Sequence, residues 1–340
     1  MTSPSVLRQA DPRRVNDLIQ AFYRSAVVFA AWELGIFKEL ADFRKRDAAA
    51  IAHGLNLNPR SATLLLDACA ALGLLEKEGH LYSNSADAEA CLVPGRSHNL
   101  SSLLMESREL YPVWERLAAF VRGGAPVEWV IGEEGEDPEQ LTAYVLSQHA
   151  QRVATGRTII RRLDLQGRRT LLEVKGGPGT YSMLISLEFP QLQCTVLDQP
   201  AIAKMAAALI AQEGAAARVT TLPGDFHTTP FPPGNDVILL FNLLHREPKD
   251  EIPMLLQRAA DALNPGGIAY VMDIMTDETH TRPAYSALSA LNLALTSREG
   301  YIFSHVELQD WIERAGLKDF AVEMLPAPAL QWLARAHKPE

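Results

Sequence analysis

The amino-acid sequence predicts an α/β fold, in which helices cover both faces of a mostly parallel sheet, preceded by a mainly α-helical domain. From residue 170 onward, short apolar runs alternate with helical segments, which is typical of a parallel sheet with crossover helices. Before residue 100, apolar residues instead recur at spacings of three and four, which indicates helices. A glycine-rich turn, KGGPGTYS, follows the first apolar run, as in nucleotide-binding sheets.

The composition limits the classes of function. A length of 340 residues favours two domains, at roughly 150 residues per domain. The net charge of -9 and the lack of a basic run argue against a nucleic-acid partner. Three widely spaced cysteines without a CxxC motif predict no disulfide framework or zinc site and favour the cytoplasm. We expect no membrane partner, because no signal core and no run of ~18 apolar residues is present.

The first helical stretch covers residues 15–40, where apolar residues recur at helical spacing. Within it, SAVVFAAW (residues 25–32) is apolar nearly all round. A helix of this kind must be buried, and another subunit is one candidate for the surface that covers it.

A winged-helix pattern follows. Asp47 and Asn58 are helix-start signals, and two short strands flank residues 78–79. This pattern suggests DNA binding, but the second helix, residues 61–72, carries almost no side chain that could read a base or bind phosphate. Helices broken by a Gly/Glu-rich loop at residues 121–140 are expected between residues 96 and 165.

The sheet elements follow in order. We expect the parallel strands at residues 170–174, 194–198, 218–225, 236–244 and 268–275, and the helices between them at residues 182–189, 202–214 and 251–263. Residues 323–339 offer two further strands that form an antiparallel hairpin at one edge.

Ligands of open α/β sheets bind at the carboxyl ends of the strands. Gly176, Gly177 and Gly179 follow the first strand and allow close approach of the backbone. Asp198 ends the second strand, 19 residues beyond Gly179, where an acid typically takes ribose hydroxyls, and residues 225–226 at the end of the third strand suit an adenine. The bland alternative is a cluster of loop glycines with two surface acids.

The motifs GGPGTYS, TVLDQP, GDF, NLLH, NPGG and ARAHKP, in this order, resemble those of class I S-adenosylmethionine-dependent methyltransferases. With the N-terminal segments FYRSAVVFAAWELGIF and LNLNPRSATLLLDACAALGLLEKEGHLYSNS, they specifically resemble the small-molecule O-methyltransferases. The resemblance covers nearly the whole chain. It implies a Rossmann-like seven-stranded methyltransferase sheet, with the last strand antiparallel. It also implies a winged-helix dimerisation domain whose helices intertwine in a homodimer.

The resemblance assigns roles residue by residue. It implies that the cofactor, S-adenosylmethionine, is bound by a set taken from successive strand ends: Glu173, Lys175, Gly176, Gly177, Gly179, Asp198, Asp225, Phe226 and Asn242. It implies that His245 is the general base, which is physically sensible because histidine titrates near neutral pH. Asp273, on the next strand, matches the acid that orients this histidine in plant-type members.

The chain departs from the family pattern at three places. Lys175 stands where the first glycine of the turn usually lies, and Arg246-Glu247 follow His245 where Asp-Trp is usual. A second acid of the plant-type enzymes falls near Ile302 and is missing. For Lys175, a positive φ would cost about 1 kcal/mol. Alternatively, its ammonium pairs with the cofactor's carboxylate or with Glu173, or takes the place of the sulfonium charge.

Candidate substrate-binding residues follow from position alone: Tyr111, Trp114, His149, Asn292 and Phe303. Each has a bland alternative, because an aromatic residue at helical spacing is often core and a helix histidine often faces solvent. We find no His/Asp/Glu cluster with metal-ligand spacing, and the family does not usually need magnesium, so no metal is expected.

The sequence therefore predicts a dimerisation domain at 1–100, connecting helices that line a substrate pocket at 101–165 and a catalytic domain at 166–340. The main hypothesis is O-methylation of a hydroxyl on an aromatic or polyketide-like small molecule. The alternatives are a methyltransferase-fold enzyme with diverged chemistry, such as C-methylation, cyclisation, decarboxylation or hydroxylation, and a non-enzymatic regulator that uses the winged helix.

Overall fold

The computed structural model describes residues 11–96, 99–127, 138–326 and 329–340. The chain forms two compact units, Met1–Tyr111 and Pro112–Glu340. Of the Gly/Glu-rich loop predicted at residues 121–140, residues 128–137 lie outside the described part. None of the helices in the described ranges is long and apolar enough to cross a membrane.

The first unit contains the predicted winged-helix pattern. The side chain of Asp47 accepts a hydrogen bond from the Ala50 amide at 2.7 Å, and that of Asn58 accepts from the Ser61 amide at 3.0 Å, so both helices begin at the predicted caps. Its helices are α1 (Pro12–Glu33), α2 (Ile36–Glu39), α3 (Ala48–Gly54), α4 (Pro59–Ala71) and α5 (Ala86–Leu92), and α6 (Ser101–Trp114) crosses into the second unit. The strands β1 (Arg46–Asp47), β2 (Leu75–Glu78) and β3 (Leu81–Asn84) form an antiparallel sheet in the order β1-β3-β2.

Helix α1 is only partly covered within one chain. Of the apolar stretch 25–32, Ala31 is buried and most of the others are half-buried. Nearer the start of the helix, Leu18 is 70% exposed and Phe22 is 50% exposed. Burial of this helix, predicted from its composition, is therefore incomplete in the single chain.

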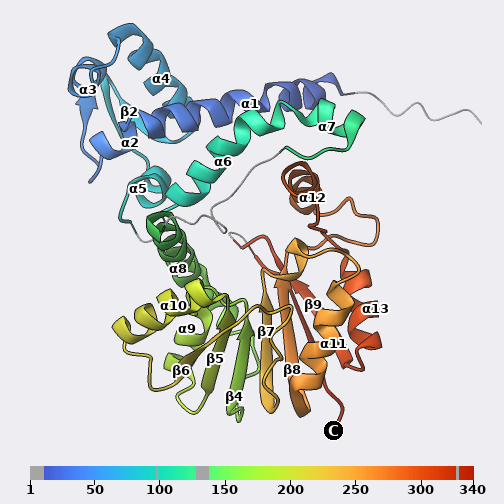
Figure 1. Cartoon of the computed structure of the whole chain (residues 1–340). Helices are drawn as coiled ribbons and strands as arrows, with labels where there is room; N and C mark the ends of the chain where they lie inside the picture. The colour runs from blue at the N-terminus through green and yellow to red at the C-terminus, as the bar shows by residue number, and fades with distance from the viewer. Residues whose placement is uncertain (1–10, 97–98, 128–137, 327–328) are drawn as a thin grey trace, which may run out of the picture. The chain divides into compact units, whose positions relative to one another are not determined.

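The second unit is a seven-stranded sheet with helices on both faces, as predicted (Figure 1). The strand order is β6-β5-β4-β7-β8-β10-β9, in which β10 is antiparallel to both of its neighbours. The strands are β4 (Thr170–Val174), β5 (Gln193–Asp198), β6 (Val219–Pro223), β7 (Asn235–Phe241), β8 (Leu263–Asp273), β9 (Lys318–Met324) and β10 (Trp332–His337). The helices are α7 (Leu117–Gly123), α8 (Pro138–Ile160), α9 (Thr180–Glu188), α10 (Pro200–Gln212), α11 (Ile252–Ala262), α12 (Ala284–Thr296) and α13 (His305–Arg314), with a 3-10 turn η1 (Leu244–Arg246).

Alternate residues of each central strand enter opposite cores, which explains why these strands read as continuous apolar runs. On β7, Ile238 and Leu240 join the core beneath α11 and α13, whereas Val237 and Leu239 join the core beneath α8, α9 and α10. Strands β4, β5, β6, β7 and β8 are parallel, so their carboxyl ends share one edge. The predicted site residues at strand ends are therefore gathered at this edge.

Candidate active site

The turn after β4 adopts the left-handed backbone that its glycines suggested. Gly177 has φ 58° and Gly179 has φ 71°, and Lys175 has φ 53°. The turn is closed by a hydrogen bond from the Gly179 amide to the Gly176 carbonyl at 3.0 Å. A left-handed conformation costs a non-glycine residue roughly 1–2 kcal/mol. The lysine therefore stands at a position where the backbone favours glycine.

Two glycines of this turn leave no space for a side chain. A Cβ atom on Gly176 would lie 2.6 Å from a methyl group of Val196 and 2.9 Å from the carboxyl carbon of Glu173. A Cβ atom on Gly177 would lie 2.9 Å from Nη1 of Arg152. The turn is thus packed between the neighbouring strand and α8.

The carboxylate of Asp198 holds the turn from the end of β5. It accepts hydrogen bonds from the amides of Gly177 at 2.7 Å and Gln199 at 2.8 Å. Burial raises the pKa of Asp198, and the two amide hydrogen bonds oppose this increase. Asp198 therefore lies beside the glycine turn, as the sequence predicts.

Glu173 lies beneath the turn and faces no open space. Its side chain is 1% exposed and accepts hydrogen bonds from the amide of Ser182 at 3.1 Å and from its hydroxyl at 2.5 Å. Burial raises the pKa of Glu173. Direct contact of Glu173 with a cofactor, as predicted, does not fit this burial. The carboxylate instead ties β4 to the first turn of α9.

Helix α8 contributes two side chains to the turn. Arg152 donates a hydrogen bond from Nη1 to the Gly176 carbonyl at 2.8 Å. His149, one turn earlier, lies 3.0 Å from the Thr180 hydroxyl through Nδ1, and desolvation lowers the pKa of His149. Sequence analysis assigned His149 to the substrate and missed Arg152. The spacing of three residues between them on one helix was the available signal.

The end of β6 carries the predicted pair Asp225 and Phe226. Asp225 accepts a hydrogen bond from the His227 amide at 2.9 Å, and Phe226 is 4% exposed. The ammonium of Lys175 lies 5.6 Å from the centroid of the Phe226 ring, within the range of a cation–π contact. The long side chain of Lys175 thus reaches from the turn to the end of β6.

A cluster of titratable groups lies next to this pair. The sequence predicts no metal-ligand cluster, but ligand atoms of His227, Glu247 and Glu251 lie within 4.8 Å of one another. Nε2 of His227 is 3.3 Å from Glu247 Oε2, and Nδ1 is 3.5 Å from Glu251 Oε2. The two carboxylates thus lie opposite the two ring nitrogens of His227. Burial raises the pKa of Glu247, and the charge of His227 opposes this increase.

His245 and Asp273 meet at the carboxyl ends of β7 and β8. Nδ1 of His245 lies 2.5 Å from Asp273 Oδ1, and the His245 amide donates to Oδ2 at 3.1 Å. The Ile274 amide donates to Asp273 Oδ1 at 2.8 Å. Asp273 is fully buried, whereas the His245 side chain is 13% exposed. Asp273 orients the ring through Nδ1, so Nε2 is the ring nitrogen that does not contact the acid.

Asn242 lies between the two halves of the site. It has φ 56°, which asparagine tolerates better than most residues, and its side-chain oxygen accepts a hydrogen bond from Nε2 of Gln331. The Asn242 amide donates to the Met272 carbonyl at 2.8 Å. The side chain predicted to face the cofactor therefore bonds to a residue just before β10.

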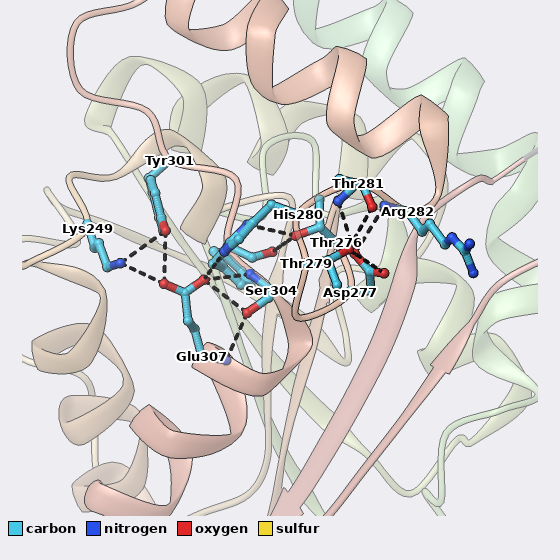
Figure 2. Close-up of polar contacts among 11 residues, drawn as sticks. Lys249, Thr276, Asp277, Thr279, His280, Thr281, Arg282, Tyr301, Ser304 and Glu307 are labelled. Atoms are coloured by element: carbon cyan, nitrogen blue, oxygen red, sulfur yellow. Dashed lines mark hydrogen bonds and ion pairs between the residues drawn. The ribbon is translucent and has the colours of Figure 1, made fainter. Parts of the chain in front are cut away.

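A second polar network connects Lys249, Tyr301, Ser304 and Glu307 (Figure 2). The Tyr301 amide donates to the His245 carbonyl at 2.8 Å. Glu307 accepts hydrogen bonds from Lys249 at 2.6 Å and from the Tyr301 hydroxyl at 2.9 Å. Glu307 also completes a capping box with Ser304 at the start of α13. This network joins the segment that follows His245, through Lys249, and the Tyr301 segment to the start of α13.

The four remaining predicted substrate residues have different environments. Trp114 donates a hydrogen bond from its indole N–H to Asn292 Oδ1 at 2.8 Å, which links the end of α6 to α12. Phe303 is fully buried and packs edge-on against Trp311, so its ring is part of the core, and its role as a pocket wall stays a prediction. Tyr111 belongs to the first unit, where its ring lies 5.9 Å from that of Phe29.

Comparisons with known proteins agree with the geometry. The O-methyltransferase domain matches residues 114–318, and the O-methyltransferase dimerisation domain matches residues 16–94. The 3-hydroxy-5-methyl-1-naphthoate 3-O-methyltransferase of Streptomyces sahachiroi is 31% identical over 324 residues, covering 93% of this chain and 92% of that protein. The N,N-dimethyltransferase OxyT of Streptomyces rimosus is 32% identical over 355 residues, covering 100% of both. Human N-acetylserotonin methyltransferase in complex with SAM has a TM-score of 0.82 and 26% identity, covering 100% of both chains.

Proposed function

The chain belongs to the O-methyltransferase family, and on this premise we propose that it methylates a hydroxyl group of an aromatic or polyketide-like small molecule, with S-adenosylmethionine as methyl donor. The His245–Asp273 pair carries this proposal, because it provides a base for the hydroxyl proton at the carboxyl edge of the sheet. The relative that methylates a naphthoate hydroxyl supports an aromatic acceptor.

The residues at the carboxyl ends of β4, β5 and β6 suit a binding site for the proposed cofactor. We assign the glycine turn, residues 176–179, to its methionine part, Asp198 to its ribose, and Asp225 with Phe226 to its adenine. We assign Asn242 to the amino-acid end. The absence of room for a Cβ at Gly176 and Gly177 explains the glycines, and the two amide bonds to Asp198 fix its carboxylate beside the turn. Lys175 fits less well, because its ammonium lies over the ring of Phe226.

In the proposed reaction the protein has two tasks, which are to align the acceptor oxygen with the methyl group and to remove the hydroxyl proton. S-adenosylmethionine supplies an electrophilic methyl group on a sulfonium. Asp273 accepts a hydrogen bond from the Nδ1–H of His245, so the lone pair of the neutral ring is on Nε2. Nε2 then takes the proton of the acceptor hydroxyl as its oxygen attacks. General-base help of this kind is worth about 10²–10⁴-fold.

N-methylation is the second candidate, because OxyT is 32% identical over the whole chain. An amine acceptor also loses a proton during methylation, so the His245–Asp273 pair serves both reactions. The two candidates differ in the acceptor atom, and the product mass after reaction with matched phenol and aniline acceptors separates them.

The test combines binding with turnover. Calorimetry should show binding of S-adenosylmethionine, and labelled methyl should appear in a phenolic product. His245→Ala should lower the rate by ~10²-fold or more and leave cofactor binding unchanged. His80→Ala, at an exposed position between β2 and β3, is the matched control. No binding at millimolar cofactor would reject methyl transfer, and an undiminished rate in His245→Ala would reject the base.

We further propose that the chain is a homodimer paired through α1. The residues Val15, Leu18, Ile19, Phe22 and Tyr23 are each at least 50% exposed and recur at helical spacing along one stripe. They lie at or near the start of the matched dimerisation domain, residues 16–94. Leu18→Asp should shift the sedimentation coefficient to that of a monomer, and an unchanged coefficient would reject this interface.

A further inference from the structure

Two positions that depart from the family pattern, Lys175 and Glu247, lie at one end of the proposed cofactor site. The ammonium of Lys175 is 5.6 Å from the Phe226 ring centroid. The rings of Phe226 and His227 are 4.1 Å apart, and Nε2 of His227 is 3.3 Å from the Glu247 carboxylate. The departures are 72 positions apart in sequence (247 − 175) but belong to one contiguous group of side chains.

Acidic groups on two other segments interact electrostatically with the Lys175 ammonium. Burial raises the pKa values of Asp198 at the end of β5 and of Glu247 after η1. The charge of Lys175 opposes this increase at both carboxyls, so its ammonium lies within electrostatic reach of each. The contact with the Phe226 ring, together with the attraction of the two acids, favours a position of the ammonium near Phe226.

We propose that Lys175 competes with the cofactor for the adenosine end of its site. In the free protein the lysine side chain occupies the space between Phe226 and Asp198, and adenosine binds only after this side chain has swung away. This inference rests on the proposed function, which assigns Asp198 to the ribose and Phe226 to the adenine. Lys175 therefore sets the affinity for every ligand that carries adenosine.

The backbone of the glycine turn cannot easily move to make room for adenosine. Its backbone is fixed by hydrogen bonds from the Gly176 amide to the Leu197 carbonyl at 3.4 Å and from Gly177 to Asp198 at 2.7 Å. Movement must therefore come from the torsions of the lysine side chain, which is long and flexible. Before adenosine binds, the ammonium must leave the Phe226 ring and the two nearby acids. The free energy that this movement costs weakens the apparent affinity for the cofactor by about 10-fold.

The experiment is calorimetry on the whole protein with S-adenosylmethionine, S-adenosylhomocysteine and adenosine. Lys175→Gly should tighten binding of all three by about 10-fold, because all three share adenosine. Lys175→Arg, which keeps a long cation, should leave the three affinities unchanged. Glu247→Gln, which loosens the hold on the ammonium, should tighten them by about 2–3-fold. Lys175→Asn, which tolerates the left-handed backbone, is the second variant if Lys175→Gly does not fold.

Each contrary result overturns the inference. Tightening confined to S-adenosylmethionine would mean repulsion of its sulfonium charge. Weaker binding of the two amino-acid-bearing ligands, with adenosine unaffected, would make Lys175 a ligand of their carboxylate. Unchanged affinities for the three ligands in Lys175→Gly would show that Lys175 does not affect binding.

A control separates backbone strain from competition. Asp319 on β9 is exposed and also has a left-handed φ of 56°. Asp319→Gly relieves the same kind of strain without changing the site, so it should leave the three affinities unchanged. If neither the natural protein nor Lys175→Gly binds any of the three ligands at millimolar concentration, the proposed function fails. If both bind with equal affinity, only the present inference fails.

Discussion

The two halves of the carboxyl edge are built differently. At the ends of β7 and β8, the acid of the His245–Asp273 pair is fully buried, and both of its oxygens accept hydrogen bonds. At the ends of β4 and β6, a lysine holds a left-handed backbone and its ammonium lies over the ring of Phe226. The groups of the proposed proton transfer are thus held by several hydrogen bonds, whereas cofactor affinity is proposed to depend on the conformation of the Lys175 side chain. Chemistry and affinity can therefore change independently.

The largest expected effect is on the β7–β8 side. Asp273→Asn removes the acceptor that holds the His245 Nδ1 proton and favours the wrong tautomer, so kcat should fall by about 10²–10⁴-fold. Affinity for S-adenosylhomocysteine should stay unchanged in calorimetry. Asp310→Asn, at a half-exposed position on α13, is the control. A fall in kcat of less than threefold would show that Asp273 does not orient the base.

On the β4 side, Gly176→Ala should lower the free energy of unfolding by about 2–3 kcal/mol, because its Cβ would overlap Val196 and Glu173. Gly214→Ala is a comparison variant with a backbone cost alone, since Gly214 has φ 72°, unlike Gly176, and nothing within 4 Å of an added Cβ. It should cost only ~1 kcal/mol, from the backbone alone. Equal losses in urea denaturation would contradict the packing argument.

Acid should weaken the network that supports His245. Burial disfavours the charge of Glu307, but hydrogen bonds from Lys249 and Ser304 outweigh it and lower its pKa from 4.5 to about 2. Because the folded pKa lies below the unfolded value, the stabilisation is complete above pH 4.5 and is lost as pH falls through about 2. Glu307→Gln should thus lower the free energy of unfolding by about 1–2 kcal/mol at pH 7, discounted for partial exposure. The difference should vanish near pH 2, and a constant difference would contradict the assignment.

The smallest effect is expected at the link between α6 and α12. Trp114→Phe removes the hydrogen bond to Asn292, which is worth about 1 kcal/mol. KM for the acceptor should rise by about 2–5-fold without a change in kcat. Because the two side chains share one bond, Asn292→Ala should add little to Trp114→Phe. Additive losses in the double variant would show that the pair does not act as a unit.

The sequence predicted the fold and the main pair because both depend on order along the chain. Strands β7 and β8 are adjacent in sequence and in the sheet, so His245 and Asp273 at their ends had to meet. Arg152 and Glu307 were missed because their contacts depend on how α8 and α13 pack against other segments. The burial of Phe303 could not be predicted, because an apolar residue near a site motif has the same sequence pattern as a core residue.

The position of β10 determines when β8 and β9 can complete their pairing. This strand lies between β8 and β9 in the sheet, yet the ribosome makes it after both. Until it emerges, β8 presents an open edge, and β9 lacks the only strand with which it pairs in the described part of the chain. Open edges of this kind template pairing with other chains. If the five parallel strands form a sheet before β10 is made, that sheet has an open edge at β8 at which aggregation can start.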